Sequence, residues 1–197
     1  MPKVVDRDQE RRAIGAALLA LAAERGLDAV SVRTVAARAG RSAGAVQKYF
    51  RTKNEMLGLA LELVAERTEQ RLDEVDRSGT PVQVLRRLVL ATLPLDPERR
   101  AEALVWAAFA VAAVHHPEFA DVLRQVDDAV SADLARWLAG RTDDPQRAAD
   151  AVLAISDGLT LRLLYAPETA ADLLPALDVT LAALLNAETT PPAPGGG

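Results

Sequence analysis

The sequence of 197 residues contains no cysteine, which excludes disulfides, thiolate metal sites and cysteine nucleophiles. Aromatic residues are also scarce, at 4%, whereas hydrophobic residues make up 50% of the chain and are largely alanine and leucine. Because alanine and leucine favour helices, such an interior must be built from aliphatic side chains packed between helices. The composition therefore predicts an all-α fold with a sizeable core.

Long hydrophobic runs and catalytic constellations are missing as well. The first residues, MPKVVDRDQERR, lack the apolar segment of a secretory signal, and the longest strictly apolar stretch, residues 103–114, is too short to span a bilayer. We find no glycine-rich phosphate loop after a strand pattern, no Ser/His/Asp arrangement and no Glu-x-x-His pairs for a di-iron bundle. We therefore expect a soluble, cytoplasmic protein without membrane association, cofactor, bound metal or enzymatic activity.

The net charge of −5 is unevenly distributed along the chain. Residues 1–55 contain 11 Lys and Arg against 6 Asp and Glu, a net charge of +5, so the remaining residues carry 12 against 22, a net charge of −10. Clustered cations attract phosphate at long range whatever the total charge is. The asymmetry favours a protein that meets nucleic acid with its amino-terminal part, with chance asymmetry as the alternative.

Three helical segments are predicted in this basic part. The first covers residues 8–25, where apolar residues recur at intervals of four and three positions along one face. Ser31 stands at the N-cap position of a short second segment that ends at Gly40, and Ser42 can cap a third segment over residues 43–49. Two such short helices are marginal alone, so we expect them to pack against the first.

The two short segments have the spacing of a helix-turn-helix between about Val32 and Phe50. Ala36 is small enough for the helices to cross closely, Gly40 can adopt the left-handed conformation of the turn, and Val46 faces inward six residues later. Purely structural helical hairpins share this spacing. The spacing alone therefore leaves DNA binding and a structural role open.

Polar and basic side chains fill the positions that are not assigned to the interior. Gln47 suits paired contacts with adenine, Lys48 suits guanine or phosphate, and Ala43 can touch a thymine methyl group. An ordinary solvated face is the alternative for each position. The candidate DNA-binding residues are Ser31, Arg33, Thr34, Arg41, Ser42, Ala43, Gly44, Gln47, Lys48, Tyr49 and Lys53.

The segment SVRTVAARAGRSAGAVQKYFRTKNEML resembles the DNA-binding region of the TetR family of regulators, with a close match from Arg11 to about Leu61. The resemblance implies a nine-helix fold, a homodimer that represses transcription from a palindromic operator, and a small-molecule effector that releases it. It also implies phosphate contacts by Ser31, Arg33 and Lys53. The family usually has Tyr three residues before Phe50, where this sequence has Gln47, so the specificity of Gln47 is not inherited.

Beyond the motif the sequence predicts long helices, four of which begin at a proline that follows Thr80, Asp96, His116 or Asp144. We expect a DNA-binding domain over residues 1–55, a ligand-binding and dimerisation domain over 56–188, and a disordered tail over 189–197. The predicted helices cover residues 57–77, 81–93, 97–115, 117–138, 145–164 and 170–187.

The last two predicted helices carry more apolar surface than one packing face requires. Leu161 and Leu164 lie off the stripe formed by Val152, Leu159 and their neighbours, and leucines also recur on the final helix, at Leu177 for example. A second copy of the chain is the favoured cover, and burial within one protomer is the alternative. A helical interaction module that dimerises in this way without binding DNA is the second hypothesis for function.

A ligand site is suggested by residues that interrupt these helices. Trp106 and Phe109 stand among alanines that leave space around the rings. Asp157 and Arg162 are charges on a largely apolar helix, where they form either a structural ion pair, which we favour, or a handle for ligand. His116 adjoins a helix end, where a cationic side chain interacts favourably with the helix dipole. We favour this role for His116 over metal binding. These five residues are the candidate ligand-binding set.

Overall fold

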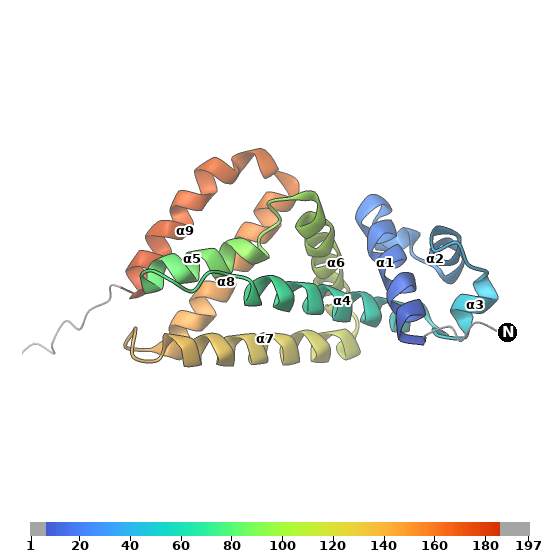
Figure 1. Cartoon of the computed structure of the whole chain (residues 1–197), viewed down its shortest axis with the longest axis horizontal. Helices are drawn as coiled ribbons and strands as arrows, with labels where there is room; N and C mark the ends of the chain where they lie inside the picture. The colour runs from blue at the N-terminus through green and yellow to red at the C-terminus, as the bar shows by residue number, and fades with distance from the viewer. Residues whose placement is uncertain (1–6, 186–197) are drawn as a thin grey trace, which may run out of the picture. The chain divides into compact units, whose positions relative to one another are not determined.

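The computed structural model describes residues 7–185, except for the side chains of Leu27 and Lys53. Within these residues the chain forms nine α-helices and two 3₁₀ turns and contains no strand, as the sequence predicted (Figure 1). No helix in the described range is both long and apolar enough to cross a membrane. The helices pack into two compact units, one formed by the described residues up to Glu74 with Pro94–His116, and the other by Val75–Leu93 with the described residues from Pro117 onward.

The first unit holds the helices of the predicted DNA-binding motif together with two longer ones. Its long helices α4 and α6 both pack against α1, and they also contact each other. Its helices are α1 (Arg7–Arg25), α2 (Val32–Arg38), α3 (Ala43–Gln47), α4 (Lys53–Asp73) and α6 (Pro97–Ala113).

The core of the first unit lies where α1 meets α4 and α6. Leu18 of α1, Met56 of α4 and Val105 of α6 are each fully buried. Gly15 of α1 permits this close packing, since a Cβ atom there would lie 2.2 Å from Cδ1 of Leu63 on α4. Helix α2 packs against α1 and α3 packs against α2, so the two short helices are attached to a helix that α4 holds tightly.

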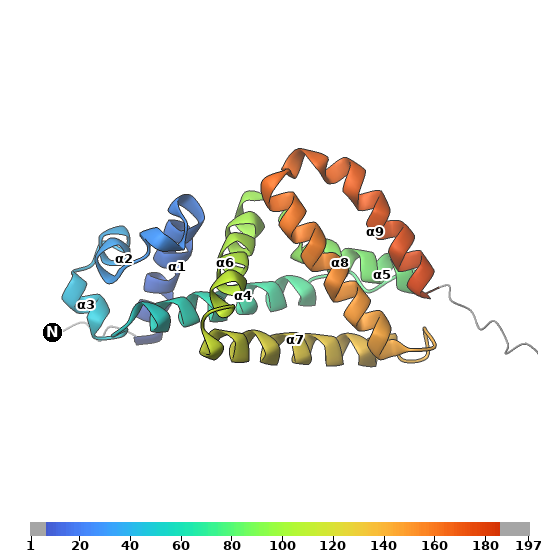
Figure 2. The same cartoon turned by 180° about the vertical axis from the view of Figure 1, so that it is seen from behind.

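The second unit contains α5 (Pro81–Thr92), α7 (Pro117–Leu138), α8 (Pro145–Tyr165) and α9 (Ala170–Leu185). Figure 2 shows α8 running back from the end of α7, and α9 turning away from the end of α8 toward α5. The turn between α8 and α9 is the 3₁₀ segment Pro167–Thr169. Packing between α7 and α8 and between α5 and α9 joins these helices around one core.

Much of the apolar surface that suggested a partner is used inside this core. Leu164, which the helical pattern placed outside the packing stripe, is buried within the protomer, as are Val152, Leu159 and Leu177. Helices α7 and α9 both pack against α8, so more of its circumference is covered than a single stripe would occupy. The residue that remains exposed from the predicted surplus is Leu161, at 58%.

Capping groups explain most helix boundaries. Thr80, Asp96 and Asp144 each accept a hydrogen bond at the start of a helix whose first residue is proline, as predicted. Helix α4 begins four residues before the predicted start because Oγ1 of Thr52 accepts a hydrogen bond of 3.1 Å from the backbone N–H of Glu55. The predicted disordered tail lies outside the described residues.

Candidate nucleic-acid interface

Ser31 and Thr34 secure the beginning of α2. The backbone N–H of Thr34 donates to Oγ of Ser31 at 3.2 Å, and the N–H of Ser31 donates to Oγ1 of Thr34 at 2.9 Å. The Thr34 hydroxyl also donates to the carbonyl of Ala29 at 2.7 Å. Two hydroxyls that the sequence suggested as DNA contacts therefore have a structural task, and Thr34 is only partly exposed.

The turn between α2 and α3 has the geometry that the motif requires. Gly40 has a φ of 65°, in the left-handed region that favours glycine. The N–H of Arg41 donates to the carbonyl of Ala36 at 2.8 Å, and that of Gly40 donates to the carbonyl of Ala37, which is the Schellman ending of a helix. Ala36 itself is buried, as predicted for a close helix crossing.

One side of helix α3 is exposed to solvent. Ser42 caps it by accepting a hydrogen bond from the N–H of Ala45, and Val46 anchors it inward with no exposed surface. The positions of α3 and its C-cap that were predicted to meet bases or phosphates are exposed, and beside Gly44 there is open space. These exposed residues are Ala43, Gly44, Gln47 and Lys48.

Several side chains here have no partner in the described part of the chain. Gln47 makes no side-chain hydrogen bond, and neither Lys48 nor Arg33 forms an ion pair with a described carboxylate. Their donors and acceptors are satisfied by solvent when no ligand is present. This exposed group, formed by Arg33, Gln47 and Lys48, is called the polar face below.

Arg41 has different surroundings from the polar face. Its Nε donates to Oε1 of Glu10 on α1 at 2.5 Å, and its Nη2 donates to Oε2 of the same carboxylate at 3.1 Å. The hydrogen bond from Arg41 lowers the pKa of Glu10 below its ordinary value, and the charge of the guanidinium lowers this pKa further. A similar bidentate pair joins Arg38 of α2 to Glu24 of α1.

Tyr49 and Phe50 close the motif at the start of α4. Phe50 is buried, and its ring lies 6.5 Å from that of the half-buried Tyr49 and 5.9 Å from the guanidinium carbon of Arg11. An open hollow of about 320 Å³ lies beside these rings and extends along α4 as far as Glu62. Lys53 opens α4, but its side chain is outside what the structure describes.

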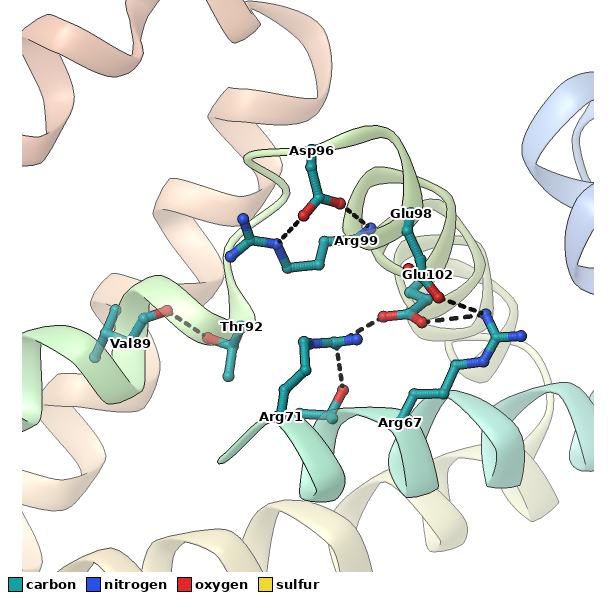
Figure 3. A network of polar contacts seen from close by, with 9 residues as sticks. Arg67, Arg71, Val89, Thr92, Asp96, Glu98, Arg99 and Glu102 are labelled. Carbon is teal, nitrogen blue, oxygen red and sulfur yellow. Dashed lines mark hydrogen bonds and ion pairs between the residues drawn. The ribbon is translucent and has the colours of Figure 1, made fainter. Parts of the chain in front are cut away.

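A buried carboxylate links α4 to α6 within the first unit. Glu102 of α6 is 3% exposed, and Figure 3 shows two arginines of α4 converging on it. Nη2 of Arg71 lies 2.7 Å from one carboxylate oxygen, and Nη1 of Arg67 lies 3.4 Å from the other. Arg67 also approaches Glu98, which is largely exposed, at 3.4 Å. Burial makes the Glu102 contacts the stronger part of this network.

The candidate ligand residues are divided between the two units. Phe109 is buried in the first unit, which also holds the half-buried Trp106 and the exposed His116. Asp157 and Arg162 lie on α8 in the second unit and are both exposed. The favoured ion pair is wrong, because neither residue has an ion-pair partner in the described chain. Five residues apart on one helix, they point to different sides.

The surroundings of Asp157 nonetheless affect its protonation. Partial burial of the carboxyl raises its pKa to about 6, and the negative charge of Asp127 on α7 contributes to the increase. The pKa of Asp127 is raised as well, by burial first and then by the charge of Asp128. The adjoining surfaces of α7 and α8 therefore carry a pair of carboxylates that no described cation compensates.

Three carboxylates that the sequence analysis did not single out organise the site, namely Glu10, Glu24 and Glu102. Each pairs with an arginine that is at least 14 positions away in the sequence. Only a long-range contact brings these partners together, so no local motif could have identified them. Glu102 follows the charged first turn of α6, so its neighbours in the sequence gave no signal that it is buried.

Two known protein families match most of this chain. Residues 14–60 match the family described as "Bacterial regulatory proteins, tetR family", and residues 81–186 match "BetI-type transcriptional repressor, C-terminal". Among curated proteins, the HTH-type transcriptional regulator PksA of Bacillus subtilis is 29% identical over 176 residues, covering 85% of this chain and 84% of PksA.

Solved structures show the same architecture over nearly the whole chain. A transcriptional regulator from Rhodococcus sp. Rha1 has 38% identity and a TM-score of 0.84, covering 92% of this chain and 99% of its own. A protein from Saccharomonospora viridis, solved in complex with choline, has 20% identity and a TM-score of 0.76, covering 92% and 98% of the two chains. The second likeness concerns the fold alone.

Proposed function

Because this chain belongs to the TetR family of transcriptional regulators, a class without enzymatic activity, we propose that it acts in the cytoplasm as a repressor of a palindromic operator. In this proposal a homodimer binds the operator with the polar face of each subunit in the major groove. A small-molecule effector then binds outside the helix-turn-helix and releases the DNA.

The observation that carries the proposal is the state of α3. Its inward residue Val46 is fully buried, so the orientation of the helix on the unit is fixed, whereas Gln47 and Lys48 are exposed. Neither side chain has an intramolecular partner in the described chain, so neither has to give up a contact in order to meet DNA. An amide and an ammonium group on one short helix suit the edges of adenine and guanine.

Phosphate contacts are proposed for residues that flank this helix. Arg33 is exposed on α2 and has no carboxylate partner among the described residues, which leaves its charge available for the backbone of DNA. Lys53 is proposed on the family resemblance, since its side chain is not described. Ser31 and Tyr49 remain candidates through hydroxyls at the edges of the motif.

Dimerisation is proposed through the outward faces of α8 and α9. Leu161 and Tyr165 of α8 are 58% and 70% exposed, and Val179 of α9 is 71% exposed. Large apolar side chains that remain in solvent on two helices packed together favour a protein partner. A second copy related by a two-fold axis would cover them and would place two polar faces on half-sites about 10 base pairs apart.

Release by an effector needs a connection between α6 and the DNA-binding helices. Glu102 supplies one, because it ties α6 to Arg67 and Arg71 of α4, and α4 begins directly after the motif. A ligand that contacts Trp106 would displace α6 and, through this link, α4. Choline is the first compound to test, since an aromatic face can hold a quaternary ammonium group.

Operator selection from random DNA followed by titration at several salt concentrations tests the proposal. We expect log K to fall with log salt by about 0.9 for each phosphate contact. Gln47→Ala should change the preferred base at one position of each half-site while leaving the salt slope unchanged. Arg162→Ala, which removes an exposed cation of α8, is the matched control and should change neither property.

Two outcomes would contradict the proposal at different levels. Absence of binding at low salt, or binding that does not respond to salt, would exclude the regulator function and favour a helical module that only dimerises. If the Gln47→Ala protein kept the wild-type base preference at every operator position, only the base-reading role of Gln47 would be excluded, and the regulator function would stand.

A further inference from the structure

We propose that Arg41 is a positioning residue that fixes the start of the recognition helix α3 through Glu10, and that it does not contact phosphate in the complex with DNA. This inference rests on the proposed DNA-binding function and assigns a role within it. It separates Arg41 from the cations of the polar face, with which the sequence alone groups it.

The guanidinium group of Arg41 is already engaged on the side that could grip a phosphate. Nε and Nη2 donate in parallel to the two oxygens of Glu10, at 2.5 and 3.1 Å, and Nη1 donates to the carbonyl of Gly40 at 3.4 Å. This is the fork geometry with which arginine otherwise recognises phosphate. The Glu10 carboxylate thus occupies the place that a phosphate would take.

The surroundings of Glu10 favour retention of this pair when DNA arrives. The side chain of Glu10 is only 12% exposed, whereas that of Arg41 is 46% exposed. If Arg41 moved to a phosphate, a poorly hydrated carboxylate would remain without its cation next to an anionic ligand. Because the protein covers most of this side chain, loss of its cation leaves the carboxylate poorly compensated, which disfavours the exchange of Arg41 to a phosphate.

The backbone of Arg41 shows why its position matters for recognition. Its N–H closes α2 through the carbonyl of Ala36, and the next residue, Ser42, is the N-cap of α3. The side chain therefore ties the turn between the two helices to the first turns of α1. Without the pair, the direction in which α3 leaves the turn would no longer be fixed, and neither would the position of the polar face.

Glu10→Gln distinguishes positioning from phosphate contact by the sign of its effect. If Arg41 positions α3, the loss of the charged partner weakens operator binding at every salt concentration, with the slope of log K unchanged. If Arg41 meets phosphate, the same substitution frees it, so binding tightens and the slope steepens. Glu62→Gln is the matched control, because it removes one negative charge of α4 that has no partner among the described residues.

A second pair of variants covers the case in which Glu10→Gln lowers stability too far for a clean measurement. Arg41→Ala should weaken binding without changing the slope, and the exchanged pair Glu10→Arg with Arg41→Glu should recover most of the affinity. A fall of the slope by about 0.9 in Arg41→Ala, or failure of the folded exchanged pair to bind, would overturn the inference. In the same titrations, Lys48→Ala serves as a reference for a residue of the polar face. Failure of the wild-type chain to bind DNA would count against the proposed function and not against the role of Arg41.

Discussion

Arg33, Arg41 and Lys48 illustrate how three cations in one short motif acquire different tasks. Arg33 and Lys48 have no carboxylate partner among the described residues, whereas Arg41 shares two hydrogen bonds with Glu10. This motif therefore contains more basic residues than cations that can neutralise phosphate. The salt dependence of binding measures the number of phosphate-neutralising cations, because only these displace counterions from DNA.

Asp157 provides a prediction about pH at the scale of a single residue. Its pKa is raised from an ordinary value of 3.8 to about 6, mainly by burial of the carboxyl and secondarily by Asp127. Between these two values the folded chain binds a proton that the unfolded chain does not bind. The free energy of unfolding therefore falls as pH rises from about 4 to about 6, and the penalty persists at higher pH.

We expect Asp157→Asn to stabilise the protein at pH 7.5 by about 1 kcal/mol, a value reduced from the full shift because the carboxyl is only partly buried and remains in contact with solvent. The difference from wild type should disappear below about pH 4, where the carboxyl is protonated in both states. Urea denaturation across this pH range checks the prediction. In an Asp127→Asn background, Asp157→Asn should retain most of its stabilising effect, because burial is the first cause of the raised pKa. A stability difference that is independent of pH would contradict the prediction.

At the scale of helices, local chemistry explains why the architecture was predictable. Prolines preceded by capping residues mark the starts of α5, α6 and α8, and Gly40 marks the turn of the motif. The start of α4 was placed too late because its apolar residues begin only at Met56, one turn after the cap provided by Thr52.

The candidate site was predictable only in part. The exposure of Gln47 and Lys48 follows from helical periodicity once Val46 is assigned to the interior. The engagement of Arg41 does not, because its partner lies on another helix at a distance of 31 positions in the sequence. Periodicity also overstated the burial of α8 around Asp157, where the structure leaves the residue exposed without an ion-pair partner among the described residues.

The link between α4 and α6 gives a prediction at this scale. Glu102→Gln removes a buried charge that binds Arg67 and Arg71, so we expect the free energy of unfolding to fall by about 1–3 kcal/mol. Glu98→Gln is the matched control, because Glu98 contacts the same Arg67 from an exposed position and should change stability by less than about 0.5 kcal/mol. Equal effects of the two substitutions in urea denaturation would show that burial does not distinguish these contacts.

For the whole molecule, the exposed apolar residues of the second unit bear on assembly. The core of this unit already takes most leucines of α8 and α9, so the surface available to a partner is smaller than the sequence suggested. The most exposed apolar residues that remain lie on these two helices, at Leu161, Tyr165 and Val179, and α7 carries a less exposed row of valines, Val122, Val126 and Val130. A symmetric partner buries each of these residues twice, once in each subunit, so a small number of side chains can hold a dimer together.

We therefore expect the double substitution Leu161→Glu with Val179→Glu to convert the dimer to monomers, since it places four carboxylates in the proposed interface. Sedimentation velocity measures the change in mass, and operator binding should weaken with it because a monomer reaches only one half-site. Val111→Glu is the matched control, as Val111 is exposed to the same 71% as Val179 but lies on α6. If only the control variant dissociated, the interface would not lie on α8 and α9. If the dimer survived both variants, it would have to assemble through another surface.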